Sequence, residues 1–237
     1  MNDIEALMKY DLILLDLDGT LLDFEQAQKI ALEKVLREFK FKFDEMALEV
    51  YRAANNRCWE KYEQGLITKA ELFINRFTDF FEEMNWDRAA AEAVNIKYTQ
   101  ILPACKRIPP ESVALCRELS KLADILITTN GEAKGQMAVI ETSGIVPFIK
   151  GVVVSESVGR PKPDPRFFDY AFNMLNFSNK GRAIILGDSL SADIKGGADF
   201  GIDTCWFNPK DTPLTGDIKP TYIIKELSQM LEICSNI

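Results

Sequence analysis

The sequence contains no histidine, and this absence excludes several classes of enzyme. Ser-His-Asp hydrolases need an imidazole as general base, and His-ligated zinc proteases need it as a metal ligand. Mechanisms that pass through a phosphohistidine are excluded for the same reason. A carboxylate is one of the few nucleophiles that remain available, and it needs no deprotonation at neutral pH.

Cysteines are few and scattered. The five cysteines include no C-x-x-C pair, and none is followed by five residues and then arginine, as a cysteine-dependent phosphatase requires. An odd number of isolated thiols is poor material for a disulfide framework or a thiolate metal site. We therefore expect buried, reduced cysteines that serve packing.

Basic residues and long apolar segments are also scarce. Lys and Arg number 28 against 36 Asp and Glu, which gives a net charge of −8. Proteins that bind nucleic-acid phosphates usually carry a basic face. No apolar run is long enough to cross a bilayer, and the first residues are acidic where a signal peptide is basic. The sequence predicts a cytoplasmic protein that binds neither a nucleic-acid polymer nor a membrane.

What the sequence does contain is a series of short, continuous apolar runs. Runs that do not alternate with polar residues are typical of parallel strands buried on both faces. Helical patterns separate the later runs, which predicts right-handed crossovers and a Rossmann-like α/β sheet covered by helices on both faces. The predicted strands cover residues 10–16, 124–128, 151–154, 183–187, 204–207 and 221–224. The predicted helices between and after them cover residues 111–122, 132–143, 166–175, 192–200 and 225–234.

Residues 22–103 interrupt this alternation. No strand is evident there, and apolar residues such as Leu72, Phe77 and Phe80 recur near helical spacing. We expect four helices, the last of them ended by Pro103, over residues 25–39, 44–62, 69–84 and 87–101. The predicted organisation is a catalytic core formed by residues 1–21 and 104–237, with an all-helical domain over residues 22–103 inserted into it.

Two acidic residues follow the first predicted strand directly. Asp16 and Asp18 stand in the motif DLDGT, where ligands bind beyond the carboxyl ends of parallel strands. Carboxylates this close repel each other unless a cation or a shared proton offsets their charge. The pair alone is equally consistent with a solvated turn, but the following Gly19 and Thr20 favour a functional site.

Three further motifs fall at the ends of later strands. TTNG, residues 128–131, offers a hydroxyl, an amide and backbone N–H groups to an anion, although Thr and Asn before a helix often serve only as caps. GRPKP places Lys162 between prolines that restrict its backbone. GDSLSAD carries Asp188 and Asp193, which can face the same edge of the sheet.

Taken together, the four motifs resemble those of the haloacid dehalogenase superfamily, specifically its magnesium-dependent phosphatases. DLDGT, TTNG, Lys162 and GDSLSAD occur in the family's order, and the resemblance covers the whole chain. The helical segment also falls where the family inserts a small cap domain. The superfamily's dehalogenases attack carbon and use neither a second Asp at position 18 nor a metal, so Asp18 and Asp188 favour phosphoryl transfer.

The resemblance implies a role for each motif residue. Asp16 would be the nucleophile that forms an aspartyl-phosphate, and Asp18 would act first as general acid and then as general base. Mg²⁺ would be held by the Asp16 side chain, the Asp18 backbone carbonyl and Asp188, and Asp193 would support these ligands by hydrogen bonding or through water. The groups implied to contact the phosphoryl oxygens, of which Thr129 and Lys162 are also catalytic, are those of Asp18, Thr129, Asn130, Gly131 and Lys162.

Two stretches outside these motifs resemble the pyrimidine 5′-nucleotidase branch of the superfamily. They are CWEKYEQG, residues 58–65, and GIDTCWFNP, residues 201–209. In the first stretch Trp59 and Tyr62 are spaced to pack into a helical core, but a base could also stack on one of them. The resemblance predicts hydrolysis of small phosphomonoesters, with pyrimidine nucleoside monophosphates as the expected substrates.

The sequence leaves other functions open. A phosphosugar or phosphoglycolate phosphatase would share every catalytic residue and differ only in the cap. A phosphomutase would need a stable phosphoenzyme and a bisphosphate activator, and a haloacid dehalogenase would need neither Asp18 nor a metal. A non-catalytic binding module usually loses a nucleophile or a metal ligand, and none is missing here. The sequence leaves both a monomer and a homodimer open.

Overall fold

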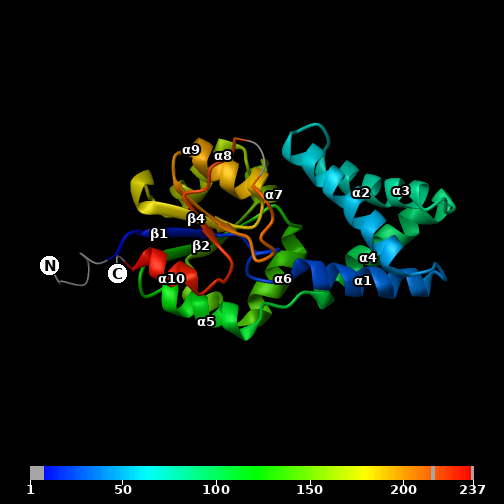
Figure 1. Cartoon of the computed structure of the whole chain (residues 1–237), viewed down its shortest axis with the longest axis horizontal. Coiled ribbons are helices and arrows are strands. Elements are labelled where there is room, and N and C mark those ends of the chain that lie inside the picture. The colour runs from blue at the N-terminus through cyan, green and yellow to red at the C-terminus, as the bar shows by residue number, and fades with distance from the viewer. Residues whose placement is uncertain (1–7, 215–216, 236–237) are drawn as a thin grey trace. The chain divides into compact units, whose positions relative to one another are not determined.

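The computed structural model describes residues 8–214 and 217–235, and they divide into two compact units (Figure 1). One unit contains the residues up to Asp23 and from Arg107 onward, and it holds the β-sheet. The other unit is the helical segment Phe24–Lys106. Each unit has its own apolar core.

The sheet unit confirms the predicted parallel α/β fold. Its six strands lie in the order β3-β2-β1-β4-β5-β6, and every neighbouring pair is parallel. The order reverses between β1 and β4, which is where open α/β sheets bind ligands. The strands are β1 (Leu12–Leu15), β2 (Asp124–Thr129), β3 (Gly151–Val154), β4 (Ala183–Gly187), β5 (Asp203–Phe207) and β6 (Tyr222–Ile224).

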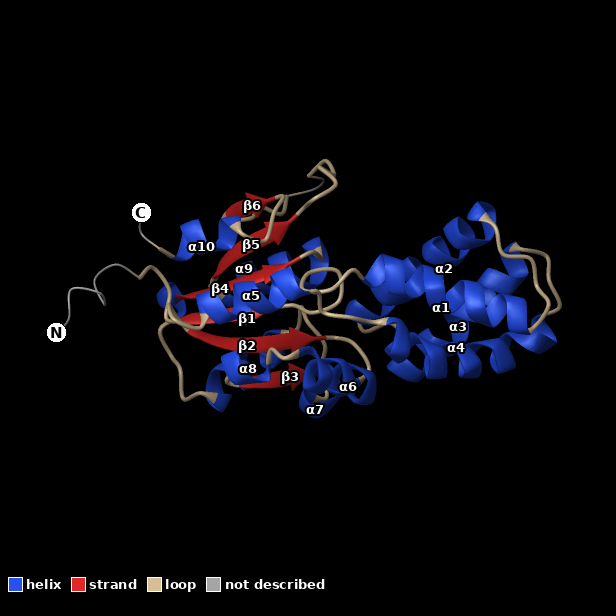
Figure 2. Ribbon diagram, turned by 90° about the horizontal axis from the view of Figure 1, so that it is seen from below, coloured by secondary structure: helices blue, strands red, loops and turns tan. Residues whose placement is uncertain are grey.

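Helices lie on both faces of this sheet, and the ribbon views show the two layers (Figures 1 and 2). On one face, Leu12 and Leu14 of β1 pack into a cluster with the aromatic side chains of α8 and α9. The stacked rings of Phe168 and Phe200, 5.4 Å apart, tie these two helices together. The helices that follow or separate the strands are α5 (Pro110–Leu119), α6 (Ala133–Ser143), α7 (Ser155–Val158), α8 (Pro165–Met174), α9 (Gly196–Phe200) and α10 (Gln229–Cys234).

The structure corrects three predicted helix boundaries. The helix expected over residues 192–200 opens with a π-helical turn, η5 (Leu190–Lys195), because the Ser189 carbonyl accepts the N–H of Ile194 as well as that of Asp193. The helix expected from residue 225 begins only at Gln229, whose side-chain oxygen accepts the backbone N–H groups of the preceding turn. The last helix of the inserted segment continues past Pro103, because a proline ring obstructs only the turn before it.

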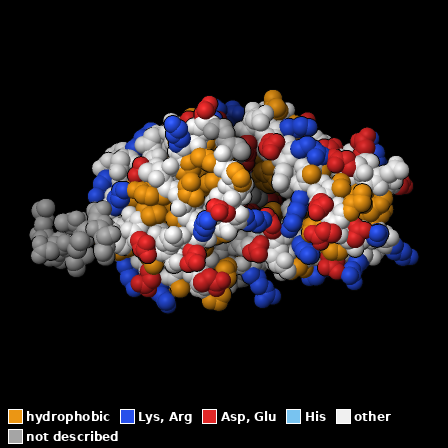
Figure 3. Space-filling model, in the orientation of Figure 1, with side chains coloured by type: hydrophobic (Ala, Val, Ile, Leu, Met, Phe, Trp, Pro, Cys, Tyr) orange, Lys and Arg blue, Asp and Glu red, His pale blue; other side chains and the backbone are white. Residues whose placement is uncertain are grey.

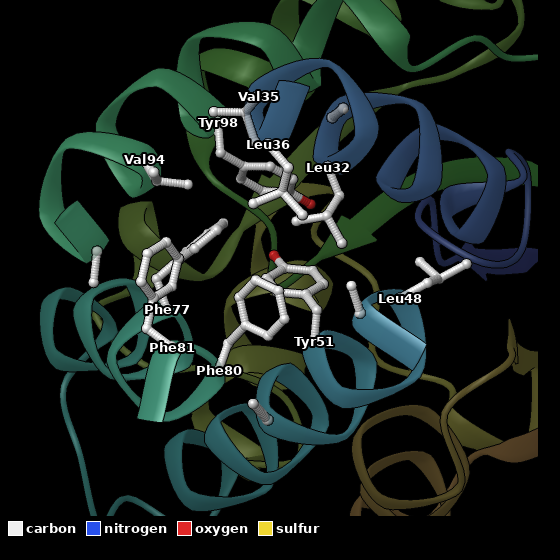
Figure 4. Close-up of a cluster of buried hydrophobic side chains, with 14 residues drawn as sticks. Leu32, Val35, Leu36, Leu48, Tyr51, Phe77, Phe80, Phe81, Val94 and Tyr98 are labelled. Atoms are coloured by element: carbon white, nitrogen blue, oxygen red, sulfur yellow. The ribbon is translucent and has the colours of Figure 1, made fainter. Parts of the chain in front are cut away.

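The helical unit contains four main helices, and side chains cap the starts of the second and third. Asp44 caps the second by accepting the N–H of Ala47, and Thr68 and Glu71 form a capping box at the third. Aromatic rings fill the interior, where Tyr51, Phe80 and their neighbours pack edge to face (Figure 4). The helices are α1 (Phe24–Glu38), α2 (Glu45–Glu63), α3 (Lys69–Glu83) and α4 (Ala91–Cys105), with a short 3₁₀ turn η2 (Arg88–Ala90) before α4.

The drawn surface (Figure 3) carries side chains of both charges, and the cysteines are free thiols. On the face drawn in Figure 3, acidic and basic side chains are interspersed. Among the helices of the described residues, none combines the length and apolar character that a membrane span needs. All five cysteines are free thiols, and all except the half-buried Cys105 are buried, as predicted.

Candidate active site

Three carboxylates converge at the carboxyl ends of the two central strands. Asp16 follows β1 directly, Asp188 follows β4 directly, and Asp193 lies in the π-helical turn η5. Leu15 and Leu186 are paired in the sheet, so Asp16 lies level with Gly187 and Asp188 follows one residue further along. One oxygen from each carboxylate lies within 4.8 Å of the others.

Lys162 supplies the positive charge inside this cluster. Its side chain is 1% exposed, and its Nζ lies 2.9 Å from Asp16 Oδ1 and 2.6 Å from Asp193 Oδ1. The third ammonium hydrogen is donated to the carbonyl of Thr128 at 2.9 Å. A buried ammonium is tolerated when all three of its donors are used and its charge is compensated, and both conditions hold here.

The electrostatics of the cluster follow from burial and from an excess of acid. Burial raises the pKa of Asp16 to about 7, and Asp193 adds to the rise while Lys162 opposes it. Burial alone would lower the pKa of Lys162, but Asp16 and Asp193 together raise it above its ordinary value. Asp188 keeps contact with solvent, yet crowding by protein atoms and then repulsion from the other two carboxylates raise its pKa well above the usual range. The site is thus an acidic centre that is only partly neutralised.

Glycines allow these carboxylates to approach. Gly19 has a φ of +91°, and a Cβ added to it would lie 2.3 Å from Asp188 Oδ2. A Cβ on Gly187 would lie 2.2 Å from the Asp193 carboxylate. Both distances are far below van der Waals contact, so the glycines of DLDGT and GDSLSAD are required by the packing of acidic side chains against the backbone.

Neighbouring groups hold the acidic residues in place. The Thr20 hydroxyl donates to Asp16 Oδ2 at 3.1 Å, so Thr20 and Lys162 engage opposite oxygens of that carboxylate. The indole N–H of Trp206 donates to the backbone carbonyl of Asp188 at 2.9 Å. Sequence reasoning assigned no role to Thr20, and it considered Trp206 only as part of a nucleotidase-like stretch.

The TTNG loop lies beside this cluster, and the side chains of Thr129 and Asn130 already have partners. Asn130 donates from Nδ2 to the carbonyl of Lys162 and accepts from the N–H of Lys162, both at 2.9 Å. The Thr129 hydroxyl oxygen accepts the N–H of Gly131 at 3.0 Å. The Asn130 amide is therefore committed to the lysine loop, and a phosphate contact from residues 129–131 remains a prediction.

Sequence reasoning also missed Gln136. This residue of α6 is fully buried, and its Nε2 lies 2.6 Å from Asp18 Oδ2 and 2.8 Å from Thr129 Oγ1. It therefore joins two residues that the motifs had singled out separately. The signal in the sequence was weak, because a glutamine one turn into an amphipathic helix is usually solvated. The start of α6 directly behind TTNG was the available clue.

The donor set fits a hard divalent cation. The three converging groups are all carboxylates, and oxygen ligands are the ones that Mg²⁺ prefers. Three acidic side chains against one ammonium leave an uncompensated negative charge that a cation would neutralise. The side chain of Asp18 is not part of this three-carboxylate group.

These features define a doubly wound α/β protein with an acidic, cation-compatible centre at the switch point of its sheet. Residues 10–201 match the family model described as haloacid dehalogenase-like hydrolase, and the chain belongs to this family. The family prediction made from the four motifs is therefore confirmed.

Curated relatives align with the chain over nearly its whole length. It is 32% identical over 225 residues to the HAD-hydrolase YfnB of Bacillus subtilis, covering 95% of both chains. It is 29% identical to pyrimidine 5′-nucleotidase YjjG of Escherichia coli, covering 95% of this chain and 98% of that one. It is also 29% identical to pyrimidine 5′-nucleotidase PynA of Streptococcus pneumoniae, covering 95% of both.

A solved structure agrees with the fold. The crystal structure of YfnB bound to magnesium superposes with a TM-score of 0.88, covering 95% of this chain and 98% of that chain. The description of that structure also reports interdomain movement. A member of the same family with 32% identity thus binds the cation that the acidic cluster of this chain fits.

Proposed function

We propose that the protein is a magnesium-dependent phosphomonoester hydrolase that works through phosphorylated Asp16. The observation that carries this proposal is the position of Asp16, which directly follows the central strand and is held between Lys162 and Thr20 in a cluster of three carboxylates. The nucleotidases among the relatives support the same class of reaction.

The chemistry follows from the side chains of this chain. The Asp16 carboxylate attacks phosphorus, the bond to the ester oxygen breaks, and Asp18 donates a proton to that leaving oxygen. Asp18 then accepts a proton from water as the water hydrolyses the aspartyl-phosphate and releases inorganic phosphate. Lys162 and Thr129 bind phosphoryl oxygens as negative charge accumulates on them.

Magnesium would be held by the Asp16 and Asp188 side chains and the Asp18 backbone carbonyl. Asp193 would support these ligands, since its two oxygens accept the Lys162 ammonium and the backbone N–H of Ser189 and so hold that part of the site in place. When bound, the ion supplies positive charge that offsets the carboxylates and the phosphoryl group.

We propose pyrimidine nucleoside monophosphates as the substrates and the helical unit as the cap that recognises the base. Two named relatives are pyrimidine 5′-nucleotidases. Within the helical unit, the half-buried Trp59 and Tyr62 form an edge-to-face pair with centroids 5.8 Å apart. A partly exposed aromatic pair can offer a ring face on which a pyrimidine stacks.

The test is phosphate release from a panel of nucleoside monophosphates and sugar phosphates, with Mg²⁺ and with EDTA. We expect UMP, dUMP or dTMP to be turned over well above sugar phosphates. Asp16→Asn, Asp18→Asn and EDTA should each abolish most of the activity, whereas the exposed control Asp169→Asn should retain it. Full activity of Asp16→Asn would overturn the mechanism, and a preference for sugar phosphates would overturn only the substrate assignment.

A further inference from the structure

The amide of Gln136 bridges two residues of the proposed active site. Its Nε2 donates to Asp18 Oδ2 at 2.6 Å and to Thr129 Oγ1 at 2.8 Å. A primary amide nitrogen carries two hydrogens, so one group can make both bonds. Gln136 is fully buried, and its backbone N–H is fixed by the carbonyl of Glu132 at 3.0 Å.

The bridge determines what the Thr129 hydroxyl can do. A hydroxyl oxygen has two lone pairs, and Thr129 Oγ1 already accepts hydrogen bonds from Gln136 and from the N–H of Gly131. With both lone pairs used, the remaining function of the hydroxyl is to donate its hydrogen. Gln136 therefore orients Thr129 as a donor, which is what contact with a phosphoryl oxygen requires.

The bridge also fixes the carboxyl group of Asp18. Oδ2 accepts the amide hydrogen of Gln136, so this oxygen faces the amide and the other oxygen, Oδ1, is the one left to face the leaving oxygen. The same hydrogen bond ties the carboxyl group to α6 and limits its rotation. A proton donor held in one orientation transfers its proton more effectively than one that rotates.

The glycine of TTNG makes room for this arrangement. A Cβ added to Gly131 would lie 2.0 Å from Gln136 Nε2 and 2.6 Å from its Cδ. Any other residue at position 131 would displace the amide from Asp18 and Thr129. The space around the bridge is therefore created by a residue of the motif itself.

We propose that Gln136 is a positioning residue that orients Asp18 as the proton donor and Thr129 as the phosphoryl-binding hydroxyl. The inference rests on the proposed phosphatase function and deepens it. Gln136 takes no part in bond making, so its effect must depend on how much the reaction needs the proton from Asp18.

The test compares two substrates that differ in this need. An alkyl phosphate such as UMP loses a strongly basic alkoxide, which must be protonated as it leaves, whereas p-nitrophenyl phosphate loses a stable phenolate. For Gln136→Leu we expect kcat/KM to fall by about 10²-fold with the alkyl phosphate, the low end of a general acid's contribution, and by about tenfold or less with the aryl phosphate. Gln136→Glu, which replaces the donor by an acceptor of the same shape, should show the same selectivity.

The controls separate this inference from the function on which it rests. Glu141→Gln changes an exposed residue of the same helix and should leave both kcat/KM values unchanged. Thermal unfolding of each variant reports whether it folds. Equal losses with the two substrates in folded variants, or no loss with either, would overturn the positioning role. A wild-type protein that hydrolyses no phosphomonoester would overturn the proposed function, and this inference with it.

Discussion

The side-chain amide of Asn130 makes both of its hydrogen bonds to the backbone of Lys162. Nδ2 donates to the carbonyl oxygen and Oδ1 accepts the N–H, each at 2.9 Å. The two residues are 32 positions apart and belong to different loops, so this pair joins the end of β2 to the loop after β3 and α7. The pair fixes the backbone of Lys162, and the side chain of this lysine places its ammonium between Asp16 and Asp193.

Replacing Asn130 by leucine should weaken catalysis through Lys162. Two hydrogen bonds to the lysine backbone are lost, so we expect kcat/KM to fall by about tenfold, which corresponds to about 1.4 kcal/mol. Lys162→Met should cost about 10²–10³-fold, as does the loss of one preorganised charge-stabilising group. The double variant should be no worse than Lys162→Met alone, because Asn130 acts through that residue. Strictly additive losses would contradict this dependence.

Magnesium binding should strengthen as the pH rises. The raised pKa of Asp16, about 7, and the raised pKa of Asp188 mean that the site holds protons below neutrality. Because the ion must displace those protons, affinity should fall by up to about tenfold per pH unit for each proton displaced below pH 7. Isothermal titration calorimetry at pH 5.5, 6.5 and 7.5, in buffers of different ionisation enthalpy, measures both the affinity and the proton release. An affinity that does not change over this range would be inconsistent with protonated carboxyls in the site.

Gly19→Ala should damage the acidic centre more than it damages the fold. Its Cβ would lie 2.3 Å from Asp188 Oδ2, so the carboxylate must move, and Mg²⁺ affinity should fall by at least about tenfold, the effect typical of changes that disturb metal ligands. Gly144→Ala is a matched control, because Gly144 has a φ of +86° and nothing lies within 4 Å of its added Cβ. Each variant should lose about 1–2 kcal/mol of stability from the left-handed backbone. Equal magnesium affinities in the two variants would refute the role assigned to Gly19.

The fold was largely predictable because burial dominates the pattern of this sequence. Leu12–Leu15 is buried on both faces, so its strand appears as a continuous apolar run without alternation. The π-helical turn at Leu190–Lys195 was not predictable, because one extra hydrogen bond from the Ser189 carbonyl leaves no mark on the spacing of apolar residues. Similarly, the Gln229 side chain accepts the backbone N–H groups of the residues where a helical turn was expected. The spacing of apolar residues does not reveal such hydrogen bonds.

The convergence of the acidic side chains was predictable from the sequence, whereas the residues that support them were not. Asp16 and Asp188 directly follow strands, and the carboxyl ends of parallel strands meet at one edge of the sheet. Gln136 and Thr20 act through side-chain hydrogen bonds whose partners depend on where a helix starts and how a loop folds. Asn130 shows the same limit, since its motif gave no sign of the hydrogen bonds that its amide makes to the backbone of Lys162.

The last prediction concerns the interior of the helical unit. Phe80 is fully buried, and its ring packs against those of Tyr51, Phe81 and Trp86 at centroid distances of 5.5, 5.6 and 5.3 Å. Phe80→Ala leaves a cavity among these rings and should reduce the free energy of unfolding by about 3–5 kcal/mol. Denaturant titration followed by tryptophan fluorescence measures the change, because Trp86 is a direct neighbour of the cavity.

Two comparisons make this prediction specific to packing. Ile74→Ala alters an exposed residue of the same helix and should change stability by less than about 0.5 kcal/mol. Every proposed magnesium ligand belongs to the sheet unit, so Phe80→Ala should bind Mg²⁺ with unchanged affinity under conditions in which the sheet unit is folded. Within the sheet unit, Lys162, Thr20 and Ser189 already hold the carboxylates of Asp16 and Asp193. If Phe80→Ala abolished magnesium binding as well as the helical core, the acidic centre would depend on the helical unit and this prediction would be wrong.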